Sequence, residues 1–149
     1  VEGGEIFEGN VERVHEFYGY GVRMAALTWN NENEIGHSAK SGSKEGIKPA
    51  GWEILRAMAE LKMAADTSHL NEAGFWDLID KHSQPPMASH SCATALCSHF
   101  RNLTDEQFAE FAKNIIDTQS MGVDAISGAT IDSQAITGGL MTAFSHKTS

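Results

Sequence analysis

Short apolar runs alternate with helical periodicities along the first two thirds of the chain. Apolar residues recur every three or four positions in three stretches, which is the spacing of one buried helix face. The runs between them are short and continuous, as in strands buried on both faces. The pattern predicts strands ending at Val1 and over 22–28, 63–67 and 87–89, and helices over 8–20, 50–61, 71–81, 92–99 and 105–113.

Local start signals support these helices. Asn10 can act as an N-cap and Pro49 stands where proline opens helices. Thr104 with Gln107 has the spacing of a capping box before the helix over 105–113. The stretch 30–46 is polar and rich in Gly and Ser, which predicts a long exposed loop.

Strands and helices alternate four times, which is the pattern of a parallel sheet in an α/β fold. Four such units are too few to close an eightfold barrel. The predicted strands are followed by polar residues, and α/β folds place their chemistry at the carboxyl ends of parallel strands. These polar residues are Glu2, Thr28, His69 and His90.

Composition and charge narrow the class of protein. The 149 residues are 41% hydrophobic and 21% charged, enough for one ordinary core. The net charge of -9 argues against a nucleic-acid partner, because a phosphate backbone needs a basic face. No apolar run approaches the ~18 residues that a membrane span requires. The sequence has no initiator Met and opens at Val1, at the expected end of a strand, so we expect a lost start or an excised piece. No signal peptide pattern is visible in it, and we assign no compartment.

The last 36 residues differ in character from the rest. They contain no Trp or Tyr and are dominated by small and hydroxyl side chains. We therefore predict two units, 1–113 and 114–149.

Glu2, His69 and His90 are candidate metal ligands. One carboxylate and two imidazoles suit zinc, and side chains leaving adjacent strands at the same edge can share an ion. Asp66 or the neighbouring serine hydroxyls could orient the two rings. The alternative is that each histidine is an ordinary polar residue at a strand end. The other histidines are expected at the surface: His15, His37, His82, His99 and His146.

Cys92 and Cys97 lie five positions apart, shortly after His90. Their spacing does not match the C-x2-C pattern of zinc sites. We interpret them as buried free thiols, since cysteine is commonly a small core residue.

An ordered series of motifs resembles the membrane (renal) dipeptidase family of zinc peptidases, over residues 1–113. The matching segments are VEGG at 1–4, GVR at 21–23, LTWN at 27–30, DTSH at 66–69, ASHS at 88–91 and RNLTD at 101–105. The resemblance implies part of a (β/α)8 TIM-type barrel that hydrolyses dipeptides with a hydroxide held between two zinc ions.

The resemblance also implies roles for single residues. Glu2 would bridge two zinc ions, and His69 and His90 would complete the second zinc site. Arg101 would hold the polar end of the dipeptide as a bidentate clamp. Trp29 stands where some members carry a histidine, and we interpret it as a wall of the substrate pocket.

The family's His-x-Asp pair and its late catalytic Asp have no counterpart in these residues. We therefore expect the chain alone to bind at most one zinc ion weakly and not to hydrolyse dipeptides. A second copy of the chain or a complementing chain could supply the missing strands, because open sheet edges favour association. The alternative is a truncated chain without activity.

A second motif lies in the tail. Asp124 opens a segment that resembles the flavinylation motif of FMN-binding domains, in which the final threonine carries FMN through a phosphoester. The expected FMN-binding residues are Ser127, Gly128, Ala129 and Thr130. Asp132 departs from the usual Thr or Ser, and a plain turn before a helix is the alternative. An FMN-carrying electron-transfer protein is thus the second functional hypothesis.

Overall fold

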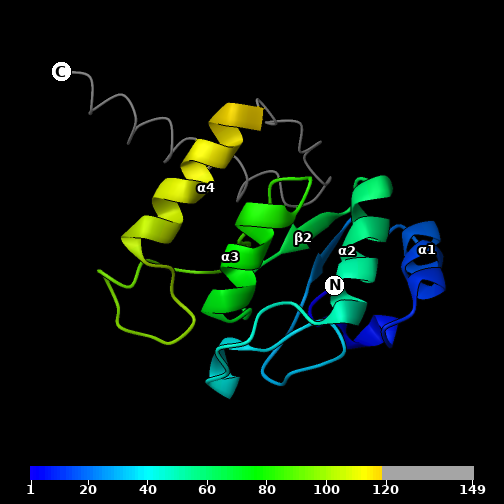
Figure 1. Ribbon diagram of the computed structural model, residues 1–149, viewed down its shortest axis with the longest axis horizontal. Coiled ribbons are helices and arrows are strands. Elements are labelled where there is room, and N and C mark those ends of the chain that lie inside the picture. The colour runs from blue at the N-terminus through cyan, green and yellow to red at the C-terminus, as the bar shows by residue number, and fades with distance from the viewer. Residues whose placement is uncertain (119–149) are drawn as a thin grey trace.

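Four α-helices follow one another in chain order across the computed structural model, which describes residues 1–118 (Figure 1). They agree in position with four of the five predicted helices, and the last continues beyond its predicted end at residue 113. Asn10 is the N-cap of the first helix, as predicted, and its side-chain oxygen accepts the Glu12 N–H at 2.9 Å. The helices are α1 (Val11–Gly19), α2 (Pro49–Glu60), α3 (Glu72–Lys81) and α4 (Asp105–Thr118).

The capping box at the start of α4 is confirmed. The Thr104 hydroxyl accepts the Gln107 N–H at 3.2 Å, and the Gln107 side-chain oxygen accepts the Thr104 N–H at 2.9 Å. Phe111 of α4 packs edge-on against Phe75 of α3, with ring centroids 5.1 Å apart. These contacts fix α4 beside α3, as expected for successive helices of a βα pattern.

Parallel pairing joins four segments of chain in sequence order. Strand β1 (Met24–Ala26) pairs with β2 (Ala64–Asp66), and Ala26 lies opposite Asp66. A single parallel bridge joins Glu2 to Ala26, and another joins Asp66 to Met87. The predicted strands over 22–28 and 63–67 are therefore shorter in the structure, and those ending at Val1 and over 87–89 are single bridges. Because every one of these pairings is parallel, all four carboxyl ends lie at one edge.

The core is formed by the strands, α1, α2 and the turn that follows the N-terminal bridge, which is the 3-10 helix η1 (Gly4–Phe7). The buried face of α2 consists of Ile54, Leu55 and Met58, each at most 1% exposed. Burying such a side chain contributes about 1.5–3 kcal/mol. The cluster comprises Phe7, Val14, Ala25, Leu27, Ile35, Ile47, Ile54, Leu55, Ala57, Met58, Met63, Ala65, Leu70 and Leu78.

The segment 30–46 is a long loop as predicted, but it is only partly exposed. Residues 35–38 are buried, and Ile35 joins the core. The Asn33 side chain accepts the Ile35 and Gly36 N–H groups and donates to the Leu27 carbonyl. The polar side chains of this segment thus satisfy its own backbone, an arrangement that hydropathy does not distinguish from solvation. A second short 3-10 helix, η2 (Ala39–Ser41), follows the buried residues.

The helix predicted over 92–99 is wrong, because the structure has only a single turn there. The Cys97 N–H donates to the Ala93 carbonyl, but the Leu103 N–H donates to the Cys92 carbonyl and the Thr94 N–H to the Leu103 carbonyl. The Asn102 side chain also accepts the Cys92 N–H and donates to the Cys97 carbonyl. These longer-range bonds replace the helical ladder.

The prediction of buried thiols is also wrong. Cys92 and Cys97 are free and exposed, since they lie on this surface turn rather than on a helix packed against the core. No helix within residues 1–118 is long and apolar enough to cross a membrane.

Candidate metal centre

The structure brings Glu2, His69 and His90 together at the carboxyl edge of the parallel segments. One ligand atom from each of the three lies within 4.8 Å of the others. The Glu2 Oε1 atom is 3.0 Å from His69 Nε2 and 3.2 Å from His90 Nε2. The two ring centroids are 5.1 Å apart. Residues separated by many positions in sequence therefore meet because each follows a neighbouring parallel segment.

His69 reaches this point from an unusual backbone conformation. Its φ of 70° lies in the left-handed region, which costs a non-glycine residue about 1 kcal/mol or more. The Ala39 N–H donates to the His69 carbonyl at 2.7 Å, and the residue is only 7% exposed. Surrounding contacts therefore hold the strained backbone in place.

A hydrogen-bond chain orients the His90 ring. The Ser89 hydroxyl lies 2.7 Å from His90 Nδ1 and donates to Asp66 Oδ2 in a very close contact. Asp66 is 1% exposed, and its Oδ1 atom also accepts the Ser68 and Ser89 N–H groups. Because serine has one proton and gives it to Asp66, Ser89 accepts from an Nδ1–H of His90. This assigns the tautomer from the network and leaves the Nε2 lone pair facing Glu2.

The electrostatics at His69 favour the neutral ring. Burial lowers the pKa of His69 below its ordinary value, and the nearby Arg101 and His90 lower it further, while Glu2 raises it. A neutral imidazole is the form that can bind a cation. The buried His69 Nδ1 atom has no hydrogen-bond partner within residues 1–118.

The three side chains fit a zinc ion by their donor set. Two imidazole nitrogens and one carboxylate oxygen are the ligands of catalytic zinc sites, which keep a further position for water or substrate. The side chains of Glu2 and His90 are 50% and 41% exposed, so the cluster faces solvent on one side. The His90 tautomer presents a lone pair to the cluster, as a ligand must. The residues therefore fit the group.

The structure places Arg101 beside the cluster and Trp29 at a neighbouring strand end. Arg101 Nη1 lies 3.4 Å from the His90 carbonyl oxygen, and the positive charge of Arg101 helps to lower the pKa of His69. Trp29 is 46% exposed beyond the end of β1. Within the described part of the chain, no hydrogen bond or ring contact joins Trp29 to Glu2, His69 or His90. Its role as a pocket wall stays a prediction.

The four residues predicted to bind FMN, Ser127 to Thr130, lie outside the described residues, so that hypothesis stays a prediction. The boundary near residue 113 also stays a prediction, although α4 runs across it.

Sequence reasoning missed His37, which it assigned to the surface. His37 is 7% exposed and lies between the carboxylates of Glu32 and Glu45. The acidic residues five positions before and eight positions after it were the only available signal.

The family described as membrane dipeptidase (peptidase family M19) matches residues 1–119 of this chain. An uncharacterized protein of Klebsiella pneumoniae is 38% identical over 113 residues, which cover 72% of this chain and 42% of that protein. An uncharacterized dipeptidase of Schizosaccharomyces pombe is 33% identical over 108 residues, covering 71% of this chain and 26% of that protein.

A solved structure shares the same fold. The metallopeptidase from Rhodobacter sphaeroides, liganded with a phosphinate mimic of the dipeptide L-Ala-D-Ala, has a TM-score of 0.70 and 34% identity. The match covers 76% of this chain and 34% of that one. The chain therefore spans less than half the length of these relatives.

Proposed function

Because this chain belongs to the membrane dipeptidase family, peptidase family M19, we propose that it carries one zinc site of a dipeptide hydrolase. The proposal rests on one observation, which is that a carboxylate and two imidazoles converge at the carboxyl edge of the parallel segments. Their Nε2 and Oε1 atoms face one another, and hydrogen bonds to Asp66 through Ser89 fix the tautomer of His90.

We propose distinct roles for the residues around the site. Glu2, His69 and His90 hold zinc, which when bound polarises a carbonyl and lowers the pKa of bound water. Arg101, beside His90, binds the carboxylate or the developing oxyanion of a dipeptide with its planar guanidinium. Trp29 forms a wall of the substrate pocket. The relative bound to a mimic of L-Ala-D-Ala supports a dipeptide as the substrate class.

We infer that the four parallel segments are part of a (β/α)8 barrel. Within residues 1–118, the candidate ligands Glu2, His69 and His90 make up one of the two zinc sites that the resemblance implies. We therefore expect these residues on their own to bind at most one zinc ion and not to hydrolyse dipeptides. Efficient hydrolysis of a simple dipeptide by the chain alone would contradict this part of the proposal.

Zinc content tests the site directly. We expect the purified chain, brought to equilibrium dialysis against excess zinc, to bind up to one zinc ion by elemental analysis. The variants His69→Ala and His90→Ala should each lose it, because each removes one of three ligands. His15→Ala is the matched control, since His15 is exposed on α1 and away from the cluster. Equal zinc content in the control and in His69→Ala would overturn the proposed site.

A further inference from the structure

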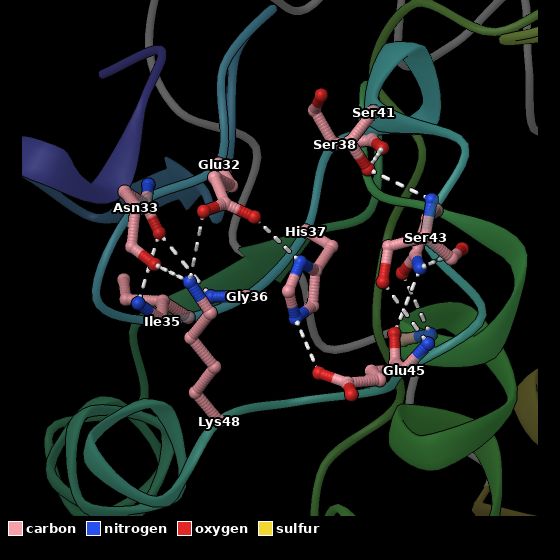
Figure 2. Close-up of polar contacts among 12 residues, drawn as sticks. Glu32, Asn33, Ile35, Gly36, His37, Ser38, Ser41, Ser43, Glu45 and Lys48 are labelled. Carbon is pink, nitrogen blue, oxygen red and sulfur yellow. Dashed lines mark hydrogen bonds and ion pairs between the residues drawn. The ribbon is translucent and has the colours of Figure 1, made fainter.

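His37 occupies a buried position between two acidic side chains that lie thirteen positions apart in sequence. Its Nδ1 atom is hydrogen-bonded to Glu32 Oε2 at 2.8 Å. Its Nε2 atom lies 3.4 Å from Glu45 Oε2, at ion-pair distance but without a hydrogen bond within residues 1–118. Figure 2 shows the imidazole ring bridging the two carboxylates, one on each nitrogen. Lys48 approaches Glu32 from the other side, with Nζ 3.9 Å from Oε1. The ring thereby ties the beginning of the segment 30–46 to its end.

The same segment is bonded to the backbone around His69. Ser38 forms an antiparallel bridge with Leu70. On one side of that bridge the Ala39 N–H donates to the His69 carbonyl at 2.7 Å, and on the other the Asn71 N–H donates to the His37 carbonyl at 3.0 Å. His37 is therefore one residue from a bridge that holds the left-handed backbone of His69.

A second set of bonds closes the segment over this bridge. The Asn71 side chain donates to the Ser43 carbonyl at 3.0 Å and to the Glu45 carbonyl at 2.8 Å. The Ser38 hydroxyl donates to the Asn30 carbonyl at 2.9 Å. We call residues 30–45 the brace. His37 joins its two ends through Glu32 and Glu45, and Ala39 in its middle is hydrogen-bonded to the backbone of His69. The Glu32 and Glu45 side chains are themselves exposed, at 57% and 85%.

We propose that His37 is a positioning residue for the zinc site, acting through the brace on the backbone of His69. No hydrogen bond, ion pair or ring contact within residues 1–118 joins its side chain to the side chains of Glu2, His69 or His90. Its contacts with Glu32 and Glu45 keep Ala39 and Asn71 in their bonds, and those bonds keep His69 Nε2 aimed at Glu2. This role rests on the proposed function, because it assigns a purpose to a conformation of one proposed ligand.

The test uses the exposed carboxylates, because replacing the buried His37 itself risks the fold. Glu32→Gln and Glu45→Gln each remove one charged partner of the ring and keep the side-chain size. Glu34→Gln is the matched control, since Glu34 is exposed in the same segment and makes no ion pair within residues 1–118. The first readout is hydrogen exchange of the Ala39 and Asn71 amides in the metal-free chain. We expect several-fold faster exchange in both partner variants and no change in Glu34→Gln.

The second readout is the zinc Kd, measured by competition with a chromophoric chelator. Replacing residues that orient metal ligands typically weakens metal binding by about 10–100-fold. Because His37 acts one step further away, we expect the zinc Kd to rise about 3–10-fold in Glu32→Gln and Glu45→Gln. The thermal midpoint of the metal-free chain should stay close to that of Glu34→Gln, whereas a purely structural role would lower it without this rise.

The outcomes separate the two proposals. Unchanged amide exchange in both partner variants overturns the positioning role whatever the zinc result. Faster exchange with an unchanged zinc Kd also overturns it, because the brace would then not act on the ligand. If the unaltered chain and His69→Ala compete for zinc equally, the proposed function fails. The exchange of Ala39 and Asn71 then decides by itself whether His37 holds the brace.

Discussion

At the scale of single residues, the site depends on groups that aim the ligands as much as on the ligands. The buried Asp66 carboxylate accepts two backbone N–H groups and the Ser89 hydroxyl, and that hydroxyl contacts His90 Nδ1. The Nε2 atom of His90 is consequently free to face Glu2. The chain of bonds orients the ring of His90 as a candidate nitrogen ligand.

Ser89→Ala tests this chain of bonds. The change removes the acceptor at His90 Nδ1 and one donor to Asp66, so both the tautomer and the ring orientation lose their support. We expect the zinc Kd to rise about tenfold or more, measured by chelator competition. Ser91→Ala is the control, because the buried Ser91 hydroxyl has no hydrogen-bond partner within residues 1–118. Equal zinc affinity in the two variants would show that Ser89 does not orient His90.

Much of the candidate site could be predicted at this scale, and the reason is positional. Glu2, His69 and His90 each follow an apolar run, and parallel pairing brings such positions to one edge. The bonds of Ser89 could be guessed only as one option among neighbouring hydroxyls. The burial of His37 could not be predicted, because its partners Glu32 and Glu45 are not at helical or strand spacing from it.

At the scale of elements, α2 lies directly against the segment 30–46 at Gly51, where no space remains for a side chain. A Cβ at Gly51 of α2 would fall well within 3.0 Å of the Ile35 carbonyl oxygen and of the Ile47 side chain. The Lys48 N–H donates to the same carbonyl at 2.8 Å. The absence of a side chain at position 51 therefore lets the helix lie directly on the backbone that leads into the brace.

Gly51→Ala should therefore destabilise the fold although alanine favours helices. The gain in helix propensity is about 1 kcal/mol, and forcing an extra methyl group into a packed site typically costs about 1–3 kcal/mol. We expect a net loss of up to about 2 kcal/mol in the free energy of unfolding, measured by urea denaturation. Gly19→Ala is the control in α1, where a Cβ meets nothing within 4 Å. A Gly51→Ala chain as stable as Gly19→Ala would contradict this packing.

At the scale of the whole molecule, the order of helices and parallel segments follows the apolar pattern of the sequence. Helical periodicity located α1, α2 and α3 because each buries one face, and the capping box at Thr104 located the start of α4. The failures share one physical cause, which is bonding and packing that follow neither the helical nor the strand period. The turn at 92–97 follows from bonds to Asn102 and Leu103, and the burial of 35–38 follows from bonds to Leu27 and from packing against α2.

The stability of the whole chain should fall on mild acidification, and His82 accounts for part of that fall. His82 is the C-cap of α3, and its Nε2 atom is buried with no hydrogen-bond partner within residues 1–118. Burial lowers the pKa of His82 below its ordinary value. The unfolded chain then takes up a proton more readily than the folded chain as the pH falls from about 6.5. The contribution of His82 is thus complete above about pH 6.5 and is lost progressively below it.

His82→Gln should flatten this dependence, because glutamine does not titrate. A single site can change the unfolding free energy by at most about 1.4 kcal/mol per pH unit, so the difference between the two chains must stay below that slope. The measurement is urea denaturation of both chains at pH 7.5, 6.5 and 5.5 without metal. His15→Gln is the matched control, since His15 is exposed on α1. Parallel stability curves for His82→Gln and the unaltered chain would show that the half-buried His82 ring does not govern the acid response. A flatter curve for His82→Gln alone would assign that part of the response to the carboxyl end of α3.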